Sequence, residues 1–255
     1  MKPLLLILCL TLSTLTFAGK NDTIKSSLLL LIDSSGSMSN AIGNGNQNIK
    51  IESAKRAAIE SVAKAVANNL VEVAILAFEG GCANPVPSYV NFTTDETKLT
   101  DFIHTLQPGG GTPMADAVLF ANKFMQDNGK PNALSQMIVL LADGQNDCGN
   151  VKQAMATLQA SGAVFRHETV GFGIEPNSQA SSDLRYIASS SGGSYHHANS
   201  ATQLADVLIG TVDTLSVIDM LGQFKYHSLG KNKPAKPKIK RNKKPSISMD
   251  LLDRI

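Results

Sequence analysis

The sequence has no tryptophan, and aromatic residues make up only 5% of its 255 residues. Cysteines are few as well, three in all, and they lie far apart in the chain. Hydrophobic residues make up 43% of the chain, which at this length is enough for one sizeable core. We therefore expect one domain with extensions at its ends.

The first residues lack the long uninterrupted apolar run that a membrane anchor requires. A single cation, Lys2, precedes an apolar stretch over residues 4–10, hydroxyl residues interrupt the stretch that follows, and the small residue Ala18 ends it. This pattern predicts a secretory signal peptide over residues 1–18, cleaved near Ala18, and a short linker over residues 19–26. We expect a secreted or periplasmic protein.

Removal of the signal peptide would leave two cysteines, Cys82 and Cys148. Each follows a predicted strand, so both could lie on loops at one end of a sheet. An even number of cysteines in an oxidising compartment favours a disulfide between them. A pair of unrelated free thiols is the alternative.

The net charge of +2 conceals an uneven distribution along the chain. Residues 1–221 have 13 Lys and Arg against 19 Asp and Glu, whereas residues 222–255 have 10 against 2. The basic, Pro/Lys-rich tail over residues 219–255 is predicted to be disordered in isolation. In an exported protein such a tail favours an anionic membrane surface or an acidic partner protein over nucleic acid, and a solvated linker without a partner is the alternative.

Apolar runs of strand length alternate with segments of helical periodicity. The predicted strands are residues 28–32, 71–78, 89–92, 137–142, 164–172 and 194–197, and the predicted helices are residues 51–70, 95–106, 114–128, 151–160, 182–190 and 201–215. This alternation predicts a doubly wound α/β fold, with a mainly parallel central sheet, helices on both faces and one short antiparallel edge strand. Ligands of such sheets bind beyond the carboxyl ends of the strands.

Polar residues follow two of these strands directly. Asp33, Ser35 and Ser37 come after the first strand, and Asp143 comes after the strand at 137–142. Because no cysteine or histidine lies near them in the sequence, their oxygens suit a hard cation, Mg²⁺ first, with Mn²⁺ or Ca²⁺ as alternatives. Taken singly, the same residues could also cap turns.

A third segment, Gly111-Thr112-Pro113, opens the helix at 114–128, where Thr112 could also serve as an N-cap. The glycines before Thr112 are not followed by the Lys-Ser/Thr of a P-loop, which argues against phosphate binding. In order along the chain, Asp33-Ser34-Ser35-Gly36-Ser37, this segment and Leu140-Leu141-Ala142-Asp143-Gly144 resemble the von Willebrand factor A (VWA) domain and its metal-ion-dependent adhesion site, in its bacterial exported form.

The resemblance covers about residues 27–216, and we place the domain at residues 27–218. It implies that Ser35 and Ser37 coordinate the ion through their hydroxyls and that Thr112 adds a hydroxyl directly or through water. Asp33 and Asp143 would hold metal-bound waters or ligate directly. One coordination position would remain for a carboxylate from a partner.

We therefore expect an exported, metal-dependent module that binds a protein partner supplying an acidic residue, and no enzyme activity. Ser35 and Ser37 have no histidine beside them in the sequence to act as a base. His196 and His197 are adjacent in a predicted strand, so their side chains should point to opposite faces. The alternatives are an assembly component of a cell-envelope complex that docks through its basic tail, and a metal-dependent hydrolase that uses an ion-bound water.

Overall fold

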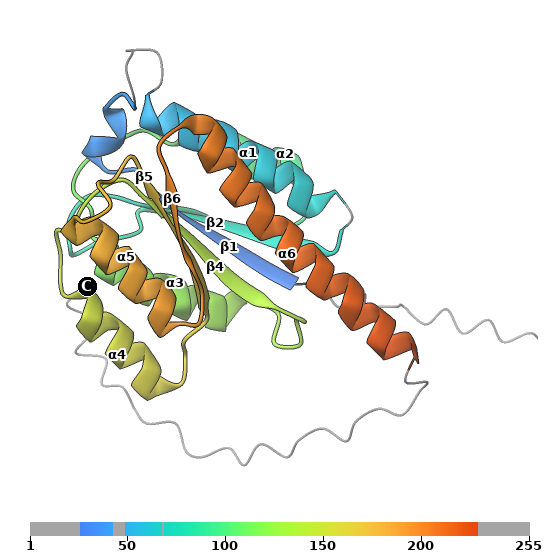
Figure 1. The fold of residues 1–255 in the computed structure, drawn as a ribbon. Helices are drawn as coiled ribbons and strands as arrows, with labels where there is room; N and C mark the ends of the chain where they lie inside the picture. Colours follow the sequence, from blue (N-terminus) through green and yellow to red (C-terminus); the bar gives the residue numbers. More distant parts are fainter. Residues whose placement is uncertain (1–25, 43–48, 68, 229–255) are drawn as a thin grey trace, which may run out of the picture.

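The computed structural model describes residues 26–42, 49–67 and 69–228 (Figure 1). The predicted signal peptide and most of the predicted basic tail lie outside these residues. The strands are β1 (Ser26–Asp33), β2 (Val71–Phe78), β3 (Ser88–Thr93), β4 (Gln136–Ala142), β5 (Arg166–Phe172) and β6 (Tyr195–Ala198). The helices are the 3₁₀ turn η1 (Gly36–Ser39), α1 (Lys50–Val66), α2 (Glu96–Thr105), α3 (Met114–Asn128), α4 (Val151–Ser161), α5 (Gln179–Ser190) and α6 (Ala201–Ser228).

The six strands form one sheet in the order β3-β2-β1-β4-β5-β6. All neighbouring strands are parallel except β2 and β3, which are antiparallel, so β3 is the antiparallel edge strand that the sequence predicts. The chain builds the sheet outward on one side of β1 and then on the other. The strand order therefore reverses between β1 and β4, and Asp33 and Asp143 lie at this switch point.

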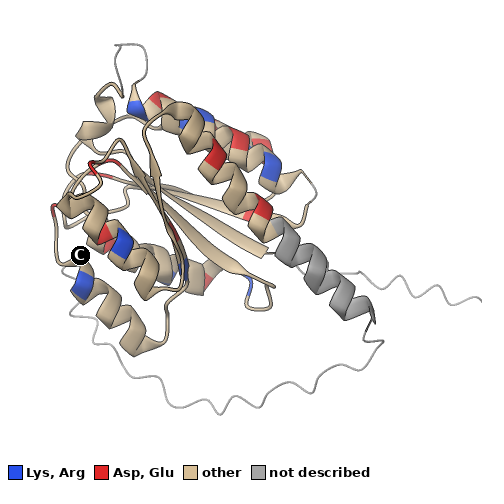
Figure 2. Ribbon diagram, viewed as in Figure 1, with Lys and Arg blue, Asp and Glu red and all other residues tan. Residues whose placement is uncertain are grey.

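Helices cover both faces of the sheet (Figure 1). Leu28, Leu30 and Ile32 of β1 belong to the core that α1, α2 and α6 share with the sheet. Leu29 and Leu31 belong to the core beneath α3, α4 and α5. Because both faces of β1 are buried, the strand is apolar at successive positions, and the strands carry few of the charged residues that Figure 2 shows.

Three helices differ from the predictions by three or more residues at one end, and one of them, α5, begins at Gln179 instead of residue 182. Helix α1 ends at Val66 instead of residue 70, and Asn69 takes a left-handed conformation with φ of 52° that a helix cannot continue through. Helix α6 extends to Ser228, beyond the predicted helix end at 215 and the expected domain end at 218, in a stretch without proline. Within the described ranges, no helix combines the length and apolar content needed to span a membrane.

Candidate metal centre

Asp33 joins the carboxyl ends of the two central strands. Its Oδ1 accepts a hydrogen bond from the backbone N–H of Ser35 (2.8 Å), and its Oδ2 accepts a longer one from the N–H of Asp143 (3.4 Å). The Asp33 side chain is fully buried. Burial and the neighbouring Asp143 carboxylate raise the pKa of Asp33 to about 7, because an ionised Asp33 would be a second negative charge in a buried place.

A line of hydroxyls connects β1 to β4. The Ser35 and Ser37 Oγ atoms are 3.0 Å apart, and Ser37 Oγ donates to Asp143 Oδ1 at 2.5 Å. Ser35 is the N-cap residue of η1, but its side chain makes no capping hydrogen bond. The two serines therefore turn their hydroxyls toward the acids instead of capping the turn.

Thr112 faces the same space from the opposite loop. A Cβ atom at position 144 would lie 3.4 Å from both Ser37 Oγ and Thr112 Oγ1, so Gly144 leaves room between the two hydroxyls. The N-cap residue of α3 is Pro113, without a side-chain capping bond. Thr112 Oγ1 has no hydrogen-bond partner in the described part of the chain, so it is not the N-cap that its position before Pro113 also suggested.

Glycines bring the Thr112 loop against the ends of β1 and β2. Gly36 N–H donates to Gly110 O (3.0 Å), and Gly111 N–H donates to Gly80 O (3.0 Å). Gly110 has a left-handed φ of 58°, and a Cβ there would lie 2.4 Å from Gly80 Cα. This close backbone contact is why the loop needs glycine at position 110.

Asp147, which the sequence reasoning missed, holds Thr112 from the β4 side. Its Oδ2 accepts from Thr112 N–H (2.8 Å), and its own N–H donates to Thr112 O (2.9 Å). Nearby, Asn146 Oδ1 accepts from the N–H of Ala115 in the first turn of α3 (3.0 Å). A second acidic residue four positions after Asp143 was the available signal, but nothing in the sequence pairs it with Thr112.

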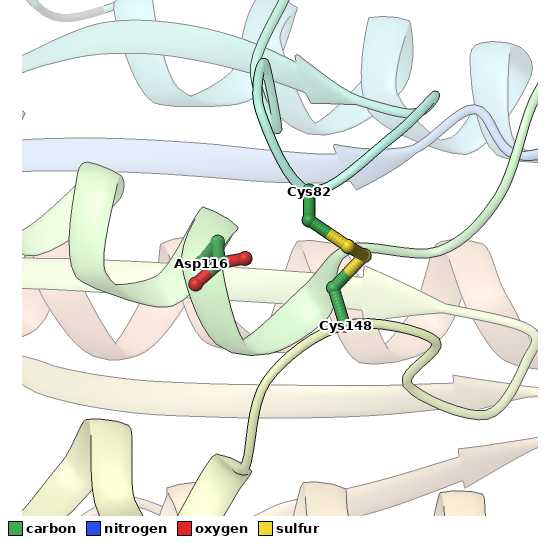
Figure 3. Close-up of side chains that lie close together, drawn as sticks. All are labelled: Cys82, Asp116 and Cys148. Atoms are coloured by element: carbon green, nitrogen blue, oxygen red, sulfur yellow. A yellow bond between two sulfur atoms is a disulfide. The ribbon is translucent and has the colours of Figure 1, made fainter. Parts of the chain in front are cut away.

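The predicted disulfide joins Cys82 and Cys148, whose Cα atoms are 5.5 Å apart (Figure 3). It links the loop after β2 to the loop after β4. Asp116 of α3 lies beside it, and burial raises the pKa of this carboxyl group. Among the described residues, these three form the only His/Cys/Asp/Glu group with ligand atoms within 4.8 Å of one another. Because the two sulfurs are bonded to each other, neither is available as a thiolate to hold a metal.

His196 and His197 lie in β6, two strands away from β4 and its site residue Asp143. His196 Nε2 contacts Glu168 Oε2 (2.9 Å), whereas His197 Nδ1 lies 3.5 Å from the Tyr195 hydroxyl, so the two histidines point to opposite faces as predicted. In the described part of the chain, no histidine is hydrogen-bonded to Ser35 or Ser37.

The five residues that the sequence singled out thus lie together at the switch point, the place that serves as the binding crevice in open α/β sheets. Their oxygens are three hydroxyls and two carboxylates, without nitrogen or sulfur, which is the donor chemistry of a hard divalent cation. The residues are Asp33, Ser35, Ser37, Thr112 and Asp143. One further group, the Lys50 ammonium, contacts Asp143 Oδ2 at 2.8 Å.

The strand order, the helices on both faces and the crevice define an α/β domain with the fold of VWA domains. Residues 28–145 match the family model described as the von Willebrand factor type A domain. This matched region contains all five crevice residues. A comparison with curated protein sequences gave no match.

Solved structures share the fold at low sequence identity. A von Willebrand factor type A protein from Catenulispora acidiphila is 21% identical with a TM-score of 0.59, over 74% of this chain and 42% of that chain. The vWF domain of the type V pili tip protein Mfa5 from Porphyromonas gingivalis is 15% identical with a TM-score of 0.60, over 76% and 96%. The PilB minor pilin from Streptococcus sanguinis is 13% identical with a TM-score of 0.60, over 79% and 63%. At these identities the likeness shows the fold alone.

Proposed function

We propose that this chain is an exported protein-binding module whose metal-ion-dependent adhesion site recognises a partner carboxylate through a divalent cation, with Mg²⁺ as the first choice. The observation that carries the proposal is the convergence of three hydroxyls on two buried carboxylates at the switch point. Ser35, Ser37 and Thr112 would hold the ion, and Asp33 and Asp143 would ligate it or orient its waters.

The neutral hydroxyl donors suit a site that recognises an anionic partner through its metal ion better than a site that stores the metal. Hydroxyls are neutral ligands, so a bound ion would keep much of its positive charge and offer an open position to an anionic group. This chain's own part is to keep the hydroxyls in place. The Asp33 carboxylate does so by binding the Ser35 N–H, and Asp143 does so by accepting from Ser37.

Two further observations support an exported binding role. The N-terminal sequence has the pattern of a secretory signal peptide, and the Cys82–Cys148 disulfide suits an oxidising compartment. The structural neighbours include the vWF domain of a type V pili tip protein and a minor pilin. The basic tail would add attraction to an anionic surface or an acidic partner.

Calorimetric titration of the purified protein with Mg²⁺, Mn²⁺ and Ca²⁺ tests the proposal. We expect one site in the wild type and none in Asp33→Ala, with circular dichroism unchanged because the core is untouched. Asp101→Ala, which removes an exposed carboxylate of α2 that is not one of the five site residues, is the matched control and should bind like the wild type. A wild-type protein that binds none of the three ions would refute the metal site.

A pull-down then tests the carboxylate ligand. Partners retained in Mg²⁺ should be released by EDTA and should not be retained by Asp33→Ala. Deletion of residues 229–255 separates binding through the crevice from binding through the tail. Retention that survives EDTA and is lost only on tail deletion would favour the assembly role instead.

A further inference from the structure

Lys50 places a positive charge inside the candidate metal centre. It is the first residue of α1, and its Nζ donates to Asp143 Oδ2 at 2.8 Å. The Lys50 side chain is 11% exposed, and that of Asp143 is 0% exposed. The contact is therefore a nearly buried ion pair, which interacts more strongly than a pair in water.

The surrounding residues hold Lys50 in this position. Its backbone N–H donates to Asn40 O at 2.9 Å. A Cβ atom at position 173 would lie 3.2 Å from both Lys50 Cε and Ile42 Cδ1, so Gly173 at the end of β5 leaves the space that the lysine chain uses. The backbone hydrogen bond of Lys50 and the space beside Gly173 thus both support the position of the ammonium next to Asp143.

Lys50 and a divalent cation would need the same acid. Asp143 uses Oδ1 for Ser37 and Oδ2 for Lys50, so both of its oxygens have partners. An ion that binds Asp143 directly, or through a water molecule, must share this carboxylate with the Lys50 ammonium. The two cations then repel each other, which weakens metal binding.

The same charge has the opposite effect on an anionic ligand. With both acids ionised and a divalent ion bound, Lys50 gives the crevice one net positive charge. A carboxylate from a partner neutralises it. Without Lys50 the metal-loaded crevice would be neutral and would attract the carboxylate less.

We propose that Lys50 is a tethered cation that weakens metal binding while no carboxylate is present and strengthens carboxylate binding once the metal is in place. Metal and partner would then bind cooperatively, so that an ion alone occupies the site poorly. This inference rests on the proposed function, because it needs a cation at the crevice.

The test compares Lys50→Met with Lys55→Met. Methionine keeps the length and the apolar packing of lysine without its charge. Lys55 is the matched control, since it is also a nearly buried lysine of α1 but pairs with Glu52 instead of the crevice. Lys50→Gln keeps a hydrogen-bond donor for Asp143 and serves as the second variant if Lys50→Met folds poorly.

Two affinities are measured on each protein. Calorimetry gives the Kd for Mg²⁺ alone, and amide chemical shifts of the Mg²⁺-saturated protein give the Kd for acetate, with acetamide as the neutral probe. We expect Lys50→Met to bind Mg²⁺ about tenfold more tightly and acetate about tenfold more weakly, the scale of one nearby charge in a partly solvated site. Lys55→Met should match the wild type in both.

The outcomes separate this inference from the function on which it rests. Wild-type protein that binds no Mg²⁺ overturns the proposed function. Wild-type protein that binds Mg²⁺, with Lys50→Met and Lys50→Gln unchanged or with both affinities moved in one direction, overturns the role of Lys50 alone.

Discussion

Asp147 binds both backbone polar groups of Thr112: its Oδ2 accepts from the Thr112 N–H at 2.8 Å, and its own N–H donates to the Thr112 carbonyl at 2.9 Å. The hydroxyl of Thr112 is thereby left free to face Ser37 across Gly144. A residue outside the predicted ligand set thus decides where one of its members lies.

Asp147→Ala should weaken Mg²⁺ binding by about tenfold, because Thr112 loses the partner that orients it. The loss of stability should be only about 1 kcal/mol, since Asp147 is exposed. Calorimetry and urea unfolding measure the two effects. Asp147→Asn keeps an acceptor oxygen and should recover most of the affinity. If Asp147→Ala bound Mg²⁺ as the wild type does, the positioning role would be wrong.

Gly110→Ala should displace the Thr112 loop. The new Cβ would lie 2.4 Å from Gly80 Cα, at a left-handed φ that alanine disfavours. We expect a loss of about 1–3 kcal/mol in the free energy of unfolding, together with weaker Mg²⁺ binding. Gly81→Ala is the control, because a Cβ at position 81 meets no atom within 4 Å. If Gly110→Ala and Gly81→Ala had the same free energy of unfolding and the same affinity for Mg²⁺, the close contact between Gly110 and Gly80 would not constrain the loop.

Replacement of both cysteines in Cys82→Ser/Cys148→Ser should lower the free energy of unfolding by about 4 kcal/mol. The bond spans 66 residues, and a closed loop of that length restricts the unfolded chain. Urea unfolding without reductant measures the effect. A dithiol reductant should destabilise the wild type by a similar amount and leave the double variant unchanged. A reductant effect on the double variant would show another cause.

His167 should make the protein sensitive to acid. Its Nδ1 lies 2.8 Å from Phe165 O and its Nε2 lies 3.1 Å from Asn122 Nδ2, so the neutral ring donates to the first and accepts from the second. Burial lowers the pKa of His167 to about 4. Between that value and an unfolded pKa near 6.5, the unfolded chain binds more protons at this residue, so stability falls as the pH falls.

The expected loss from His167 is about 3 kcal/mol between pH 6.5 and pH 4. Urea unfolding across this range measures it. His167→Gln should flatten this part of the pH profile, whereas His104→Gln, which removes an exposed histidine of α2, should not. A profile that His167→Gln leaves unchanged would assign the acid sensitivity to other groups.

Much of the fold was predictable because it depends on local patterns. The apolar run of β1 and the helical periodicity of α1 and α3 identify the elements, and their alternation predicts a parallel sheet with helices on both faces. The end of α1 was harder to place, since the left-handed Asn69 has no strong sequence signal. The length of α6 exceeded the prediction, and residues 216–228, which continue the helix, contain no proline.

The candidate site, like the fold, was predictable from the sequence only in part. By itself, the sequence determined which residue types stand at the strand ends: Asp33, the two serines and Asp143, with Thr112 before a helix. Only the tertiary structure decided that these residues share one crevice, that Asp147 holds the Thr112 loop and that Lys50 contributes a charge. The physical reason is that such contacts depend on the order and register of strands distant in the chain, which the packing of the whole core selects.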